Sequence, residues 1–78
     1  MAQFILCINA GECFPIEAAT PREAARMARR MGKDLMKYNN ESSLYWIWDA
    51  EAENCLYYVQ TVKVGNRIVS AIRNCQKI

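Results

Sequence analysis

The chain contains four cysteines and no histidine. Without an imidazole, the commonest general base is missing, and so are the Ser-His and Cys-His pairs of nucleophilic catalysis. No glycine-rich phosphate loop or nucleophile elbow occurs, and the carboxylates show no spacing that pairs two of them for acid–base chemistry. The sequence therefore predicts a protein that is not an enzyme.

The cysteines lie at positions 7, 13, 55 and 75, and these spacings match neither a zinc knuckle nor a CxxC redox motif. We expect no signal peptide, because the N-terminus lacks a basic segment followed by a long apolar run. No stretch approaches the roughly 20 apolar residues of a bilayer span. These features predict a cytoplasmic protein that has no membrane contact, no metal and no cofactor.

In the cytoplasm, cysteines are thiols by default, and we expect all four to pack as small apolar residues. Oxidation is the alternative, because the spacing brings two pairs together in the expected sheet. Cys7 would face Cys13 across the first hairpin, and Cys75 would lie next to Cys55.

Six cations lie between positions 22 and 37, and with Glu23 and Asp34 they give this segment a net charge of +4 against −2 for the rest of the chain. At about 100° per residue, the six share one arc of a helix, opposite its apolar side. Like charges at this spacing destabilise a helix slightly, so stability alone would not select them. We expect them to bind phosphate or an acidic protein surface, and a plain solvated helix face is the alternative. The six are Arg22, Arg26, Arg29, Arg30, Lys33 and Lys37.

The stretch TPRE is a helix start, with Thr20 as N-cap, Pro21 at the first helical position and Glu23 closing a capping box. It predicts one helix from about Pro21 to Tyr38, in which Gly32 is a weak point that costs about 1 kcal/mol against alanine. The expected apolar side consists of Ala24, Met27, Ala28, Met31, Leu35 and Tyr38.

Alternating apolar residues predict two strands before the helix, with Phe4, Leu6, Ile8, Phe14, Ile16 and Ala18 on the core face. A three-residue loop with Gly11 in the left-handed position would join them, and Pro15 places the second strand at a sheet edge. Residues 44–49, 55–64 and 67–75 read as further strands, the last two joined by a Gly-Asn turn. We expect one α+β domain over residues 1–78, with the order β-β-α-β-β-β and a five-stranded antiparallel sheet under one helix.

A single helix covers only one face of such a sheet, so the other face should be open. Taking Asp49 and Lys63 as markers of the open side, we expect it to carry Ile5, Cys7, Tyr45, Ile47, Tyr57, Val59, Ile68 and Ile72. The helix would then cover Trp46, Trp48, Leu56, Val62 and Val69. An apolar patch of this kind predicts a homodimer or partner interface; the alternative is that the sheet curls and buries part of the patch itself.

Direct contact with nucleic acid is a second possibility. One helix cannot make a helix-turn-helix, and the element order is not that of an RNA-recognition motif. Aromatic side chains on the later strands could nevertheless stack on bases. These are Tyr45, Trp46, Trp48, Tyr57 and Tyr58.

In overall form the whole chain resembles small phage-encoded anti-CRISPR proteins: it has fewer than 100 residues, with a first hairpin leading into IEAATPREAARMARRMG and an antiparallel meander after it. The resemblance implies an inhibitor without catalysis that binds a subunit of a CRISPR effector complex and blocks target-DNA binding or nuclease recruitment. These proteins share no common motif, so it assigns no residue a role. Many of them are acidic mimics of DNA, whereas this chain carries a net charge of +2. The cations would instead meet an acidic protein surface or the guide and target backbone.

Overall fold

In a computed structural model that describes residues 1–9 and 11–75, the chain begins with a hairpin of β1 (Ala2–Ile8) and β2 (Cys13–Ala18). Its register is the one that the apolar alternation predicts, since Leu6 faces Phe14 across the pair. Of the two described loop residues, however, Asn9 has the left-handed backbone, with a φ of 51°, and the expectation for Gly11 is wrong. Asparagine tolerates this backbone, and here the Asn9 side-chain oxygen also accepts a hydrogen bond from the Leu44 N–H at 2.9 Å.

The helix α1 (Pro21–Asn39) begins where the capping residues predict. The Thr20 hydroxyl accepts a hydrogen bond from the Glu23 N–H at 3.1 Å, and the Glu23 carboxylate accepts one from the Ala19 N–H at 2.9 Å. The first bond satisfies a backbone donor that the first helical turn leaves without a partner, and the second ties the residue before the N-cap to the helix. At the other end, Asn40 has a left-handed φ of 56° and its N–H donates to the Met36 carbonyl, which ends the helix.

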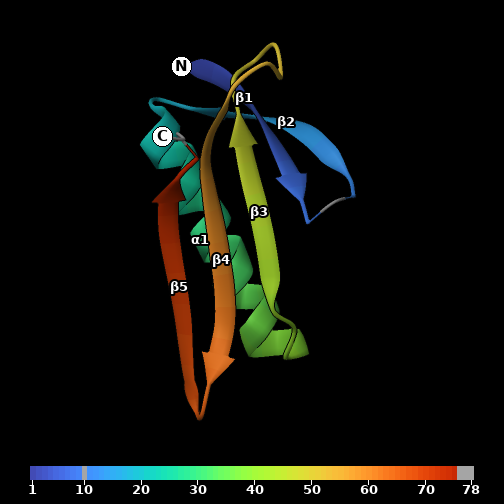
Figure 1. Ribbon diagram of the computed structural model, residues 1–78, viewed down its shortest axis with the longest axis vertical. Coiled ribbons are helices and arrows are strands. Elements are labelled where there is room, and N and C mark those ends of the chain that lie inside the picture. The colour runs from blue at the N-terminus through green and yellow to red at the C-terminus, as the bar shows by residue number, and fades with distance from the viewer. Residues whose placement is uncertain (10, 76–78) are drawn as a thin grey trace.

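After the helix come β3 (Ser43–Trp48), β4 (Cys55–Val64) and β5 (Arg67–Asn74). The five strands pair antiparallel in the order β2-β1-β3-β4-β5, and α1 lies across one face (Figure 1). The predicted α+β fold with the order β-β-α-β-β-β is thereby confirmed. Pro15 lies in the edge strand β2, as expected of a residue without a backbone donor. Gly65, at a φ of 64°, makes the tight turn between β4 and β5.

The core lies between α1 and the sheet. The helix contributes small side chains to it, and the strands contribute larger ones. Gly32 marks a point of close approach, because a Cβ there would lie 2.5 Å from the Thr61 hydroxyl oxygen and 2.9 Å from that of Ser43. The glycine predicted to be a weak point in the helix is thus a point of tight packing. The core cluster consists of Phe4, Leu6, Ala18, Ala24, Ala25, Ala28, Tyr45, Ile47 and Val59.

The predicted choice of open face is wrong for β3, β4 and β5. Tyr45 is 3% exposed, and Ile47 and Val59 are fully buried beneath α1. Tyr57 and Ile72 pack partly buried against the same core. Ile68 shares the strand face of Ile72, but it lies towards the far end of β5 and stays exposed. The prediction holds for Ile5 and Cys7, which alternate with the buried Phe4 and Leu6.

The two polar residues used as markers explain this error. Asp49 lies just after β3 and holds the 49–54 turn, where its carboxylate accepts hydrogen bonds from the N–H groups of Glu53 and Asn54. Lys63 does lie on the helix side, but past the end of α1, where its ammonium donates to the Asn40 side chain at 3.3 Å. The position of these two polar side chains therefore does not indicate which face of the strands is open to solvent.

The outward face of the sheet instead carries Trp46, Trp48, Val62 and Val69, for which the sequence predicts the helix side. A bulge in the pairing of β3 with β4 lets both Leu56 and Tyr57 contact the core, so the prediction for Leu56 holds.

The helix is also rotated from its expected orientation. Ala25, Gly32 and Met36 are buried, while Tyr38 is 73% exposed. Met27, Met31 and Leu35, predicted to lie on the apolar side, are half-buried at its margin.

Candidate functional site

The cations of α1 form the first candidate surface. Four of them, with Asp34, line a shallow hollow of about 280 Å³ on the helix. Because α1 buries its small residues against the sheet, this hollow opens to solvent, although Arg29 is half-buried. Such an arrangement can bind an anionic group, because the positive potentials of several neighbouring cations add and exceed the potential of a single surface cation. The four are Arg26, Arg29, Arg30 and Lys33.

The other two predicted cations do not line this hollow. The Arg22 guanidinium lies over the ring of Tyr57, 5.9 Å from its centroid, and the Lys37 ammonium lies 5.5 Å from the centroid of Tyr38. Both arrangements are cation–π contacts. The structure therefore divides the predicted six-residue stripe into a central group of four and two end residues that contact aromatic rings.

The open sheet face is the second candidate surface. One row of directly paired residues crosses all five strands in the order Cys13, Cys7, Trp46, Tyr58 and Arg73. The rings of Trp46 and Tyr58 are in contact, with centroids 5.3 Å apart and planes inclined by 37°. This row, here called the aromatic row, combines stacking surfaces with a cation at one edge.

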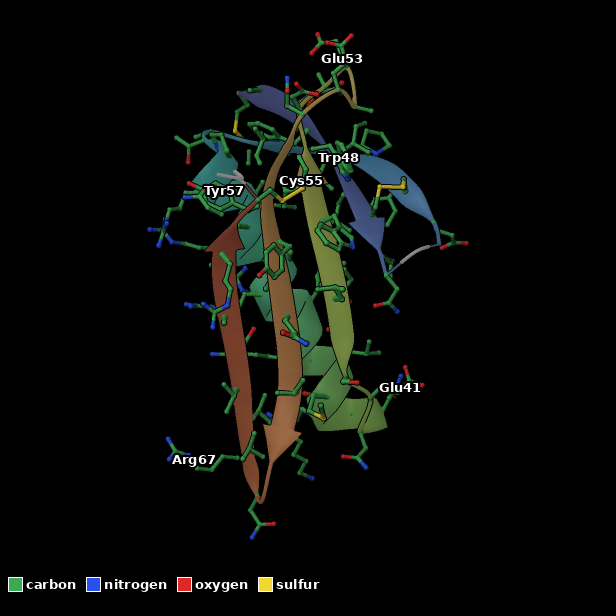
Figure 2. The ribbon with its side chains drawn as sticks, in the orientation of Figure 1. Glu41, Trp48, Glu53, Cys55, Tyr57 and Arg67 are labelled. Carbon is green, nitrogen blue, oxygen red and sulfur yellow. A yellow bond between two sulfur atoms is a disulfide. The ribbon has the colours of Figure 1, made fainter. Side chains whose placement is uncertain are left out.

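Beside the aromatic row lies a mostly apolar hollow of about 310 Å³. Its lining comes from β3 and from the end of the first hairpin, and it consists of Cys7, Asn9, Gly11, Cys13, Trp46 and Trp48. Trp48 belongs to the next row of the sheet, where it pairs with Ile5 and with Cys55. Figure 2 labels Trp48 and Cys55.

The four cysteines form two disulfides, Cys7–Cys13 and Cys55–Cys75, so the prediction of free thiols is wrong. Cys7 and Cys13 face each other next to the Ile8–Glu12 hydrogen bond, at a position where paired side chains come closest in an antiparallel sheet. Their Cα atoms are 3.9 Å apart, and those of Cys55 and Cys75 are 5.8 Å apart. Both separations are below the roughly 7 Å beyond which a bridge requires backbone movement.

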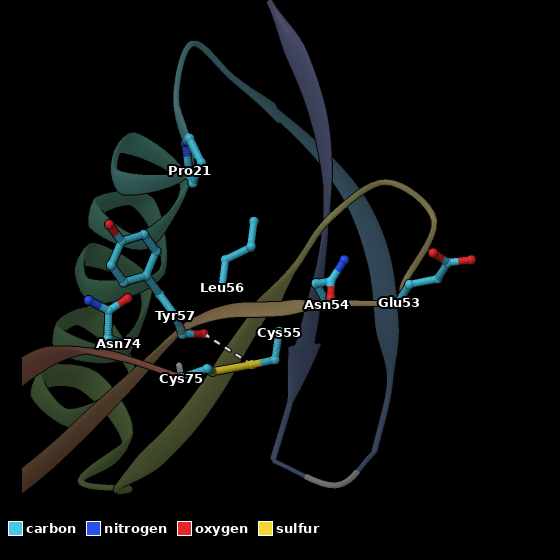
Figure 3. A pocket seen from close by; sticks show the side chains of 8 residues that line it. All are labelled: Pro21, Glu53, Asn54, Cys55, Leu56, Tyr57, Asn74 and Cys75. Carbon is cyan, nitrogen blue, oxygen red and sulfur yellow. Dashed lines mark hydrogen bonds between the residues drawn. A yellow bond between two sulfur atoms is a disulfide. The ribbon is translucent and has the colours of Figure 1, made fainter. Parts of the chain in front are cut away.

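A larger, more polar hollow of about 710 Å³ lies beside the second disulfide. Figure 3 shows the Cys55–Cys75 bond along one side of it, with Pro21 and Tyr57 on the side of α1. Asn54 contributes to this hollow and also donates a 2.8 Å hydrogen bond to Asp49. That bond, together with the N–H of Glu53, lowers the pKa of the Asp49 carboxyl below its usual value. Asn54 and Glu53, which line this hollow, thus also hold the 49–54 turn.

Sequence reasoning found the helix cations and missed the aromatic row. The register of the first hairpin correctly places Cys7 on the open side, but the pairing of Cys7 with Trp46 is known only from the structure. The phase of β3 then follows, since alternate residues of a strand share a face.

Within residues 1–9 and 11–75, no helix is both long and apolar enough to span a bilayer. The same residues contain no cluster of three or more His, Cys, Asp or Glu side chains in position to hold a metal ion. Searches of known protein families, curated proteins and solved structures find no match to this chain.

Proposed function

We propose that this protein is a non-enzymatic interaction module that binds an acidic surface of a partner complex through the cationic side of α1. One observation carries the proposal: Arg26, Arg29, Arg30 and Lys33 gather around one hollow on the side of α1 away from the sheet. Their mutual repulsion works against the helix. A role in binding explains their grouping, whereas a role in folding does not.

In its sharpest form the module is an anti-CRISPR-type inhibitor. Its helix cations would meet acidic protein surface, or the guide and target backbone, of an effector complex and block target-DNA binding or nuclease recruitment. The support is the overall form of the chain: a small domain with one cationic helix on an antiparallel sheet. Opposite charges across such an interface speed association more than they raise final affinity.

The compartment in which such an inhibitor acts is that of its partner complex, and the sequence predicts the cytoplasm. The two disulfides are evidence against the cytoplasm, because such bonds are typical of oxidising compartments. An inhibitor in a reducing cytoplasm must keep its fold with its cysteines reduced. Activity is therefore best measured inside cells, with the thiol state of the recovered protein determined alongside.

A plasmid-interference assay tests the function. Cells that carry one defined CRISPR system each are transformed with a targeted plasmid while expressing this chain, and transformants are counted. We expect the chain to restore transformation in at least one system. Arg30→Glu combined with Lys33→Glu should abolish the effect. As a matched control, Lys63→Glu with Arg67→Glu makes the same charge change on the β4–β5 hairpin and should retain the effect.

If the Arg30→Glu, Lys33→Glu variant inhibits as well as the parent, the helix cations do not bind the partner and form only a solvated face. Restoration in no system tested, together with tight binding to random duplex DNA, would favour a nucleic-acid-binding protein that uses the same helix. Such binding would weaken steeply with salt, with a slope of about −0.9 for each phosphate contacted.

Assembly through the sheet, the second alternative, loses most of its predicted interface. Tyr45, Ile47 and Val59 are buried beneath α1 and cannot meet a second chain.

A further inference from the structure

The aromatic row has a composition that the fold does not require. Trp46, at its centre, and Tyr58 beside it are half-buried on a face that α1 does not cover, and Arg73 is exposed at the β5 edge. Core residues of a small domain are normally buried as completely as its packing allows. A pair of touching aromatic rings left in contact with water, with a cation in the same row, is more typical of a binding surface.

Spacing along β3 restricts what can lie on this surface. Trp46 and Trp48 are two residues apart on one strand, so they lie about 7 Å apart. That distance is about twice the 3.4 Å rise of one strand in B-DNA. Two neighbouring bases that stack on the two indoles must therefore be unstacked from each other, which a single strand permits and a duplex does not.

Charge gives the second restriction. Strands lie about 4.8 Å apart, so Arg73 begins about 10 Å from Trp46, two strands away, and its long side chain can reach further. Arg67 extends the positive charge along the same edge of the sheet, while Glu17 on this face lies on β2 at the opposite edge. A strand whose bases lie over β3 and β4 would thus carry its phosphates towards β5.

We propose that the open sheet face binds single-stranded nucleic acid, with bases stacking on Trp46, Tyr58 and Trp48 and a phosphate paired with Arg73. The apolar hollow between the Cys7–Cys13 disulfide and the two indoles accepts the edge of one base. This site lies on the opposite side of the sheet from the α1 cations, and it is a second site, independent of the function proposed for the helix.

Both tryptophans of the chain lie on this face, so intrinsic fluorescence reports on it directly. The test is a titration of the full chain, with both disulfides intact, with a ten-residue oligothymidylate. We expect saturable quenching with a dissociation constant of about 10⁻⁴–10⁻⁶ M. The same oligonucleotide in a duplex with oligoadenylate should bind at least about tenfold more weakly, because its bases are not free to stack.

Variants locate the site. Trp46→Ala should weaken binding about tenfold, and Trp46→Phe, which keeps a ring and the fold, should recover most of the loss. Arg73→Gln should reduce the slope of log affinity against log salt by about 0.7, the value for one single-strand phosphate. Tyr38→Ala is the matched control, since Tyr38 is an exposed aromatic residue on α1, and it should bind like the parent.

Three results would overturn the proposal: no saturable quenching, equal losses in Trp46→Ala and Tyr38→Ala, or a dimer that Trp46→Ala dissociates while the oligonucleotide leaves the fluorescence unchanged. The last result would assign the face to a second copy of the chain. At 0.15 M salt, where charges interact over only about 8 Å, the Arg30→Glu, Lys33→Glu variant should bind the oligonucleotide normally. The experiments therefore distinguish a failure of the proposed helix function from a failure of the proposed nucleic-acid site on the sheet.

Discussion

On one side of the sheet, α1 shields Tyr45, Ile47 and Val59 from solvent almost completely, whereas on the other side Trp46, Trp48 and Tyr58 remain half-exposed. The covered side is held together by packing of apolar and small side chains. Among residues 1–9 and 11–75, no second layer covers the open side, and this side carries both disulfides. Figure 2 shows the two yellow sulfur–sulfur bonds on the side of the sheet that faces away from the helix.

This difference indicates how so small a domain can leave one sheet face free for binding. A chain of this length buries only about 60% of the surface that it exposes when unfolded, so its packing energy is limited. Disulfides stabilise the folded state without a second apolar layer, because they act largely by lowering the conformational entropy of the unfolded chain. The open face can then present aromatic residues to a ligand.

The largest expected effect concerns the disulfides. Replacing Cys55 and Cys75 by serine should lower the free energy of unfolding by about 3 kcal/mol, and replacing Cys7 and Cys13 by about 2 kcal/mol. The order follows from the lengths of the closed loops, since the bonded residues are 20 and 6 positions apart. Urea unfolding of the oxidised proteins measures both values. Losses in the reverse order would show that unfolded-chain entropy does not govern these bonds.

A matched pair of valines tests the two faces next. Val59 is fully buried, and Val69 on the neighbouring strand is 44% exposed on the open face. Val59→Ala should cost about 2 kcal/mol of unfolding free energy, because it leaves a cavity, whereas Val69→Ala should change it by less than about 0.5 kcal/mol. Thermal unfolding followed by circular dichroism gives both numbers, and similar losses at the two sites would contradict the assignment of the faces.

A smaller effect than that at Val59 is expected at Gly32, where the helix approaches the sheet closely. Alanine normally improves a helix by about 1 kcal/mol relative to glycine, but a Cβ at Gly32 would lie 2.5 Å from the Thr61 hydroxyl oxygen. Overpacking costs about 1–3 kcal/mol, so Gly32→Ala should reduce stability by about 1 kcal/mol in denaturant titrations.

The double variant Gly32→Ala, Thr61→Ala should lose less than the sum of the two single changes, because the nearer of the two clashing oxygens is gone. The nearby exposed position gives the control, since Lys33→Ala should be nearly neutral. A Gly32→Ala protein more stable than the parent would mean that α1 can move away from the sheet without loss.

Local sequence determined the elements of this protein. The capping residues Thr20 and Glu23 fixed the start of α1, Gly65 fixed the last hairpin turn, and the alternation of Phe4, Leu6 and Ile8 fixed the first hairpin register. Each of these signals acts over a few residues, through a hydrogen bond, a backbone angle or the two-residue period of a strand. They need no knowledge of distant parts of the chain, and the fold class followed from them.

Tertiary structure alone decided which face of β3, β4 and β5 meets the helix, and with it the composition of the candidate sites. Both faces of these strands are apolar, so their alternation did not distinguish inside from outside. The choice depends on what the helix brings to the contact: Ala24, Ala25, Ala28 and Gly32 form a flat surface that approaches the sheet closely. The sequence already brought Cys7 opposite Cys13 and Cys75 next to Cys55. Only the tertiary structure decided that both pairs are bonded, because a disulfide requires bonding geometry as well as proximity.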